Sequence, residues 1–277
     1  MKNRFWQSQS VATVIALFST MLFLFPVYWM FTTSIKPMSS IFSVPPELVP
    51  SNVTAEAYTE NILRNPDLLG YFGNSIIIAG GTLLLTLLLA APIAYALARL
   101  DIKGKGPIIG IMLVTQMLPS IMLALPFFLL FSSLGLLNSF PALILANTTT
   151  AMPFAILVLR PFFMSIPKGL EEAAAIDGSN RFFTFVRIIL PLAKPGLLTV
   201  GLFAFLFAWG DLLFALILTT DESIRPLTLY LFTFIGQYGT DWNSLMAVSF
   251  VAVIPIILIF IFFQKHIVEG IASGSMK

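Results

Sequence analysis

Six long apolar stretches constrain this chain more than any other feature of its sequence. They lie near residues 11–33, 74–98, 107–131, 140–159, 196–218 and 245–263. Each is long enough to cross the roughly 30 Å hydrocarbon core of a bilayer as a helix. Hydrophobic residues make up 58% of the chain and charged residues only 10%, whereas about a quarter of the residues of a soluble domain are charged. The sequence therefore predicts an all-α integral membrane protein, a single membrane domain spanning residues 1–277 with six transmembrane helices.

Lysine and arginine residues are divided unevenly between the two sides of these spans. One side has only Lys36, Arg64 and Arg225. The other side has Lys2, Arg4, Arg99, Lys103, Lys105, Arg160, Lys168, Arg181, Arg187, Lys194, Lys265 and Lys277. Because cytoplasmic loops carry the excess of basic residues, we expect the second side, with both termini, to be cytoplasmic. We expect the first span to be a retained anchor, since it is longer than a signal-peptide core and rich in aromatic residues.

The loop over residues 165–191 joins the fourth and fifth stretches and predicts two short helices. Glu171 and Glu172 suit the first turn of a helix begun near Pro167, and the alanines that follow favour a helix. Gly178 can take the left-handed conformation that ends this helix and turns the chain. A second helix then follows, ended by Pro191, with an apolar face made of Phe182, Phe183, Phe185 and Val186. The loop is thus expected to form a compact knob with acidic and apolar surface.

The same loop has a recognisable spacing: Glu-Ala-Ala, three residues, Gly, nine residues, then Ile-x-Leu-Pro. It resembles the EAA loop of the membrane subunits of bacterial ABC importers, which docks on a separate ATP-hydrolysing subunit. The resemblance implies ATPase-coupling roles for Glu171, Glu172, Ala173, Ala174, Asp177, Gly178, Arg181, Ile188, Leu190 and Pro191. The alternative is an ordinary cytoplasmic connector between two spans.

Other stretches extend this resemblance over nearly the whole chain. They are 25–26, 34–37, 94–99 and 237–242, with Gly270 and Gly274 near the end. They look like the permeases that import carbohydrates, specifically the shorter, six-span, maltose-permease-like partner. The resemblance implies a type I ABC importer permease fold in a bacterial or archaeal plasma membrane. It also implies a second permease subunit, two copies of an ABC ATPase and an extracytoplasmic sugar-binding protein, with no nucleic acid involved.

The residues needed for catalysis are missing from the sequence. There is no G-x-x-x-x-G-K-[ST] pattern, so ATP and Mg²⁺ are expected on the partner ATPase and no cofactor on this chain. There is no cysteine, a single histidine and no metal-ligand cluster. An intramembrane enzyme is therefore disfavoured, and the chain is expected to be a non-catalytic subunit.

Asp211 is the sole acidic residue expected inside a span, which makes it a candidate for the substrate path. Asn147, in the polar interruption of the fourth span, is expected to face the bundle interior and is also a candidate for the substrate path. Trp209 could stack on a sugar ring or simply pack, and Asp211 could equally be a structural residue bonded within its own bundle. A secondary transporter of a small polar solute is the alternative function. It would need coupling-ion residues within the spans, and the sequence has none there beyond Asp211.

Overall fold

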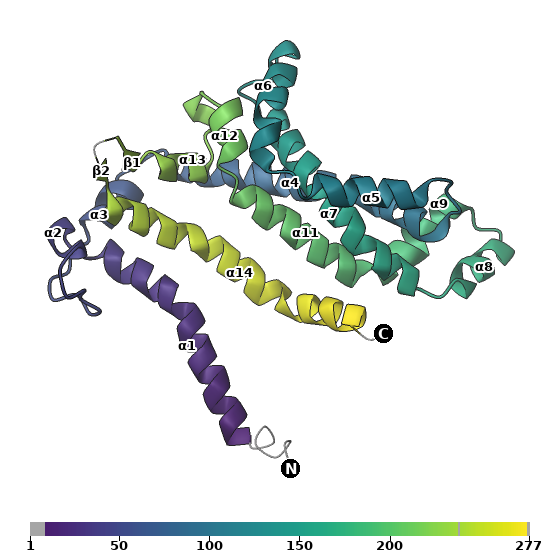
Figure 1. Ribbon diagram of the computed structural model, residues 1–277, viewed down its shortest axis with the longest axis horizontal. Coiled ribbons are helices and arrows are strands. Elements are labelled where there is room, and N and C mark those ends of the chain that lie inside the picture. Colours follow the sequence, from purple (N-terminus) through teal and green to yellow (C-terminus); the bar gives the residue numbers. More distant parts are fainter. Residues whose placement is uncertain (1–8, 238, 276–277) are drawn as a thin grey trace. The chain divides into compact units, whose positions relative to one another are not determined.

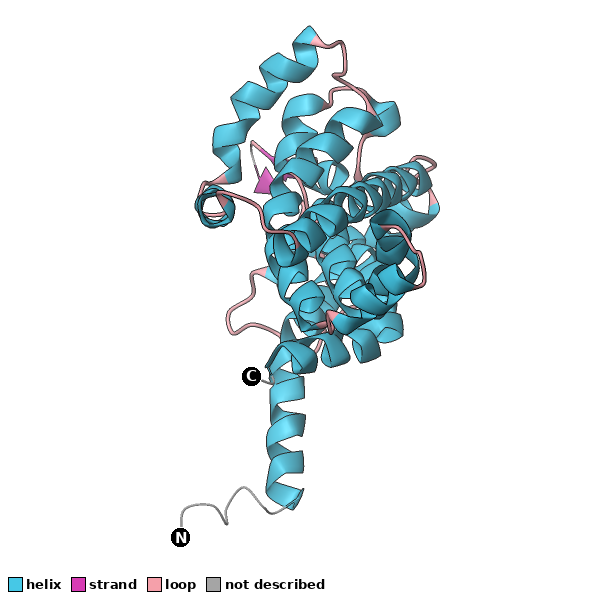
Figure 2. Ribbon diagram, turned by 90° about the vertical axis from the view of Figure 1, so that its right-hand side faces the viewer, coloured by secondary structure: helices cyan, strands magenta, loops and turns pink. Residues whose placement is uncertain are grey.

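The computed structural model describes residues 9–237 and 239–275, with side chains over 11–237 and 239–264. Of the residues used in the predictions above, Lys2, Arg4, Tyr238 and Lys277 lie outside this description, as does the side chain of Lys265. The described residues are mostly helical, with one short two-stranded sheet (Figure 2). The chain divides into two compact units, unit 1 (residues 1–68 and 231–255) and unit 2 (residues 69–230 and 256–277).

Unit 1 contains one long helix, several short turns and a β-hairpin (Figure 1). Its elements are α1 (Gln9–Ser34), α2 (Met38–Ile41), α3 (Glu56–Tyr58), the π-helical η1 (Thr59–Leu63), β1 (Ile235–Gly236), β2 (Gly239–Thr240) and the first part of α14 (Trp242–Ser275). Side chains fasten the extended segments, since Asn243 donates to the carbonyl of Lys36 and Asn61 donates to Ser244 at 2.8 Å. The ammonium group of Lys36 is buried and lies 4.7 Å from the ring centre of Trp29. The segment between α1 and α3 is thereby held against the end of α1.

Unit 2 is a bundle built around three long helices. Its elements are α4 (Leu68–Arg99), α5 (Lys105–Thr115), the 3₁₀ turn η2 (Ser120–Leu123), α6 (Ala124–Ser133), α7 (Phe140–Ser165), α8 (Gly169–Ile176), α9 (Arg181–Thr184), the π-helical η3 (Phe185–Ile189), α10 (Leu190–Leu192), α11 (Lys194–Trp209), α12 (Leu213–Leu218), the 3₁₀ turn η4 (Glu222–Ile224) and the start of α13 (Leu227–Phe232). Helix α7 packs against α5, α11 and α12. It is therefore the central helix of this unit.

Small residues let the helices of unit 2 approach closely. Ala90 and Ala94 of α4 are fully buried in one core cluster with Ala155 and Leu159 of α7. A Cβ atom on Gly196, in the first turn of α11, would lie 2.6 Å from the ring of a phenylalanine of α7. In lipid, where no hydrophobic force draws helices together, such close packing supplies much of the stabilisation.

Two of the six expected spans are broken rather than continuous helices. The stretch 107–131 is split between α5 and η2–α6, which meet at an angle of 100°. The break covers residues 116–119 and ends at Pro119, which disfavours helical geometry at the residue before it. The stretch 196–218 is split between α11 and α12, with Gly210, Asp211 and Leu212 between them. By length and composition four helices can cross a membrane singly, or up to six if each of two bent pairs forms one span. These pairs are α5 with η2–α6, and residues 181–192 with α11.

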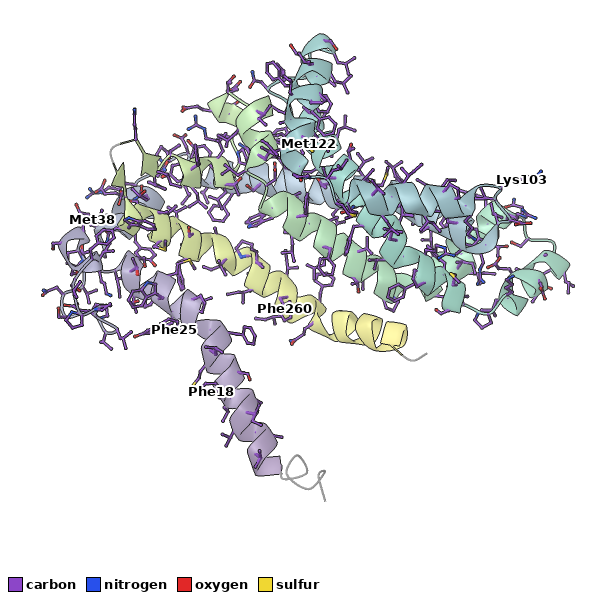
Figure 3. All side chains as sticks on the ribbon, in the orientation of Figure 1. Phe18, Phe25, Met38, Lys103, Met122 and Phe260 are labelled. Carbon is purple, nitrogen blue, oxygen red and sulfur yellow. The ribbon has the colours of Figure 1, made fainter. Side chains whose placement is uncertain are left out.

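The surfaces of the long helices are strongly apolar. Phe18 and Phe25 project from α1 into open space, and Phe260 projects from α14 (Figure 3). Apolar side chains exposed along a whole helix suit a surface in contact with lipid or with another membrane subunit, not with water. The chain is thus a multi-pass membrane protein, while its division as one membrane domain stays a prediction.

Candidate functional site

The first helix of the 165–191 loop, α8, ends in a left-handed turn at Gly178. Gly178 has a φ of +80°. Its N–H donates to the carbonyl of Ala175 at 3.1 Å, and the N–H of Ser179 donates to the carbonyl of Ala174 at 2.9 Å. These two bonds form a Schellman motif, which satisfies the last carbonyls of the helix. The turn predicted from the sequence is confirmed, and it fixes the direction in which the chain leaves α8.

The second helix of the loop begins at an N-cap and runs through α9, η3 and α10. The side chain of Asn180 accepts a hydrogen bond from the N–H of Phe183 at 2.8 Å, as an N-cap residue should. The prediction that Pro191 ends this helix is wrong by one residue, since the helix continues to Leu192. Pro191 lies at the start of α10, directly after the π-helical η3, where its missing N–H is tolerated. The chain then bends by 79° into α11.

The inner face of the knob packs on the main core of unit 2. Ala174, Phe185 and Ile189 are buried. The ring of Phe185 lies 4.8 Å, centre to centre, from the ring of Tyr95 on α4 and 6.2 Å from that of Phe163 on α7. The loop is therefore part of the folded unit and not a free connector.

The outer face of the knob exposes apolar side chains, here called the outer patch: Ile176, Phe182, Phe183 and Val186. Ile176 is 86% exposed and Phe182 is 76% exposed. The sequence predicted one apolar face that included Phe185, and this is wrong because Phe185 turns inward to the core. A basic group borders the patch, since the guanidinium of Arg187 lies 4.0 Å from the ring centre of Phe183. The knob thus presents an apolar surface with charged neighbours.

The other residues predicted to couple to an ATPase differ in exposure. Ala173, Asp177, Arg181 and Pro191 are exposed, whereas Ile188 and Leu190 are half-buried against the core. Figure 1 shows α8 and α9 together at the end of unit 2 remote from α12. The exposed members are accessible to another protein, and the half-buried ones hold the knob in place. Their role in coupling stays a prediction.

Glu171 and Glu172 are neighbours in the first turn of α8 but have different surroundings. Glu172 is exposed. Glu171 forms an ion pair with Arg99 at the end of α4, at 2.7 Å between Oε1 and Nε, and its Oε2 accepts a hydrogen bond from the hydroxyl of Tyr95 at 3.2 Å. Only 5% of the Arg99 side chain is exposed, so most of this pair is removed from water.

The pairing of Arg99 and Tyr95 with the loop was missed by sequence reasoning. Both residues lie in the 94–99 stretch that carries part of the family resemblance, but this stretch by itself does not indicate their partner. A basic and an aromatic residue at the end of a span, beside a loop with one glutamate more than the motif needs, are the signals available in the sequence. Arg99 and Glu171 are 72 residues apart along the chain, so their contact cannot be predicted from local sequence patterns.

Asp211 lies in the break between α11 and α12 and is bonded to neutral groups of its own unit. Its Oδ1 accepts from the N–H of Phe214 at 3.2 Å, and its Oδ2 accepts from the amide of Asn147 at 3.4 Å. Its carbonyl accepts from the hydroxyl of Thr228 at 2.6 Å. These bonds explain the break, because the carboxylate replaces the missing partner of the first N–H groups of α12. A place for Asp211 in the substrate path stays a prediction.

The structure places the other two path candidates inside unit 2. Asn147 is fully buried and also donates to the carbonyl of Leu143 at 3.0 Å. Trp209 is buried, with its ring stacked on that of Phe205 at 5.6 Å between centres. Both side chains are therefore packed against other residues of unit 2, and their part in a substrate path stays a prediction. Within the described residues no group of three or more histidine, cysteine, aspartate or glutamate side chains could hold a metal ion.

The chain belongs to the family of binding-protein-dependent transport system inner membrane components, which it matches over residues 90–273. It is 40% identical over 256 residues to the trehalose transport system permease protein SugB of Mycobacterium tuberculosis, covering 92% of each chain. It is 34% identical over 276 residues to the diacetylchitobiose uptake system permease protein DasC of Streptomyces coelicolor, covering 99% of this chain and 98% of that one. The predicted membership of the carbohydrate-uptake ABC permeases is confirmed.

The fold is also shared with a solved structure, that of a bacterial ABC transporter involved in the import of the acidic polysaccharide alginate. The TM-score is 0.77 with 24% sequence identity, and the match covers 96% of this chain and 99% of that chain. The predicted type I ABC importer permease fold is confirmed. The relatives are named as permease proteins, in keeping with a chain that carries no catalytic site of its own.

Proposed function

We propose that this chain is the permease subunit of a binding-protein-dependent ABC importer that takes up a sugar or a short oligosaccharide. Three relatives are named for trehalose, diacetylchitobiose and trehalose/maltose transport, and the match to each covers more than nine-tenths of this chain. The chain forms the translocation path together with a second permease. A sugar-binding protein delivers the substrate from outside, and two copies of an ABC ATPase bind ATP and Mg²⁺.

The knob carries this proposal. Two short helices are fixed at an angle by the Gly178 turn, and the outer patch leaves apolar side chains facing solvent. Apolar clusters on a rigid loop mark contacts with other proteins. We infer that the ATPase docks on the outer patch and on Glu172, and that ATP-driven closure of the ATPases moves the knob and with it the helices of unit 2.

The orientation is part of the same proposal, with both termini and the knob in the cytoplasm. Lys103 lies in the turn between α4 and α5, at the end of unit 2 that also carries α8 and α9 (Figure 3). Arg181 and Arg187 belong to the knob itself. Lys103, Arg181 and Arg187 thus lie at one end of this unit, and this supports the proposal that this end is cytoplasmic.

Reconstitution in proteoliposomes tests the proposal. Uptake of labelled trehalose, maltose and diacetylchitobiose is measured with this chain, its second permease, the ATPase, the binding protein and ATP, and again with each component left out. We expect uptake of at least one of these sugars to need every component. Uptake by this chain alone, driven by a proton or sodium gradient, would instead establish the secondary transporter.

A further inference from the structure

The two adjacent glutamates of α8 differ in their exposure and in their partners. Glu172 is exposed, and its carboxylate forms no ion pair within the described part of the chain. Glu171 is committed to Arg99 and Tyr95, both of them on α4. A carboxylate whose two oxygens are occupied inside its own subunit is a poor contact for a second protein. The two acids therefore cannot serve the same purpose.

Arg99 is fastened at a second point. Its Nη2 donates to the carbonyl of Ile166, at the end of α7 where the loop begins. A further bond runs in the other direction, from Nε of Arg160 on α7 to the carbonyl of Leu97 on α4, at 3.4 Å. The end of α4 is thus tied both to α8 and to the end of α7.

The connectivity of unit 2 makes this tie significant. The loop is covalently continuous with α7 and α11, whereas α4 leaves the region through its own turn into α5. Helix α4 can follow a movement of the loop only through non-covalent contacts. Separating an ion pair that is largely removed from water leaves uncompensated charges, which strongly opposes separation.

We propose that Tyr95, Arg99 and Glu171 form a link, here called the α4–loop link, through which α4 moves with the knob when the ATPases close. Glu171 is a positioning residue that acts through Arg99, while Glu172 faces the ATPase. This inference rests on the proposed function, and it separates the roles of two glutamates for which the family resemblance implies the same role.

Substitutions at the link can be made without large repacking. A cavity of about 270 Å³ borders the pair, and Tyr95, Arg99, Glu171 and Glu172 all line it. Glu171→Gln keeps the shape of the side chain and removes its charge, and Arg99→Met keeps most of the length. Glu172→Gln, one residue away, makes the same change of charge outside the link and is the comparison variant for ATPase binding.

The test is the number of sugar molecules imported per ATP hydrolysed by the complete transporter in proteoliposomes. We expect Glu171→Gln and Arg99→Met to lower this ratio about 3- to 10-fold, and Tyr95→Phe to lower it less. Glu171→Gln should weaken ATPase binding by less than Glu172→Gln does. The charge exchange Arg99→Glu with Glu171→Arg should restore part of the ratio. A purely structural role would reduce the amount of folded protein but leave the ratio of the remainder unchanged, and that result would overturn the link.

A double-mutant cycle separates failure of the link from failure of the proposed function. Thermal unfolding of the solubilised permease pair is compared for Glu171→Gln, Arg99→Met and the combined variant. If the link exists, the combined variant should be no less stable than the less stable of the two single variants, because each single change already breaks the same ion pair. Additive losses would overturn the link even if no transport substrate were found, whereas absent ATP-driven uptake by the unaltered protein would count against the proposed function alone.

Discussion

Two carboxylates of unit 2 are partly shielded from water, one beside the knob and one in a broken span, and their partners differ in charge. Glu171, beside the knob, has a positively charged partner in Arg99. Asp211, in the α11–α12 break, is bonded to a backbone N–H and to the amide of Asn147, and the described residues give it no ion pair. We therefore expect a neutral side chain to replace Asp211 but not Glu171. The contact beside the knob is therefore an ion pair, whereas the carboxylate in the break has only neutral hydrogen-bond partners.

The largest effect is expected at Gly178, where the shape of the knob is fixed. A valine there would need a φ of +80°, a conformation that costs a β-branched residue about 1–3 kcal/mol. A Cβ at this position meets nothing within 4 Å, so the backbone alone is affected. We expect Gly178→Val to reduce ATP-driven uptake more than 10-fold at normal expression.

Gly104 provides the matched control for that variant. Gly104 has a φ of +82°, and a Cβ added there also meets nothing within 4 Å. It lies in the turn between α4 and α5, outside the 165–191 loop. Gly104→Val should carry a similar backbone cost but leave uptake within about 2-fold of the unaltered protein. Equal losses in both variants would mean that general destabilisation, and not the direction of the knob, explains the result.

A smaller effect is expected in the break. Asp211→Ala leaves the N–H of Phe214 without its partner, and a buried unsatisfied donor costs about 1–3 kcal/mol. We expect a lower unfolding temperature and less assembled complex, measured in detergent. Asp211→Asn should be nearly silent, because an amide oxygen can accept the same hydrogen bond. If instead both variants assemble normally and lose uptake, Asp211 belongs to the substrate path.

Much of the knob could be predicted from its sequence because its determinants are local. Alanines and two glutamates in the first turn favour α8, and Gly178 is the residue that a left-handed turn requires. The direction in which Phe185 points could not be predicted in this way. Its neighbours Phe182 and Phe183 are equally apolar, and only the aromatic core contributed by α4 and α7 decides which of the three is buried.

The broken spans show that the apolar composition of a stretch does not predict whether its helix is continuous. The stretch 196–218 is long enough to form one membrane-spanning helix. It is nevertheless divided into α11 and α12, because Asp211 accepts a hydrogen bond from the first turn of α12. Its partner Asn147 lies 64 residues earlier in the sequence. The same holds for Arg99 and Glu171, since neither periodicity nor motif spacing pairs two residues on different helices.

The central claim is that the knob docks on a separate ATPase in the cytoplasm, and single cysteines test it most directly because the chain has no cysteine of its own. Ile176→Cys places a thiol in the outer patch. Val44→Cys places one at a 94% exposed position between Lys36 and Arg64, on the side expected to lie outside the cytoplasm. In intact cells, an impermeant thiol reagent should label Cys at 44 and not at 176. In membranes, a short thiol-to-amine cross-linker should join position 176, and not position 44, to the ATPase subunit. Labelling of position 176 from outside, or cross-linking of the ATPase to position 44 alone, would contradict the account.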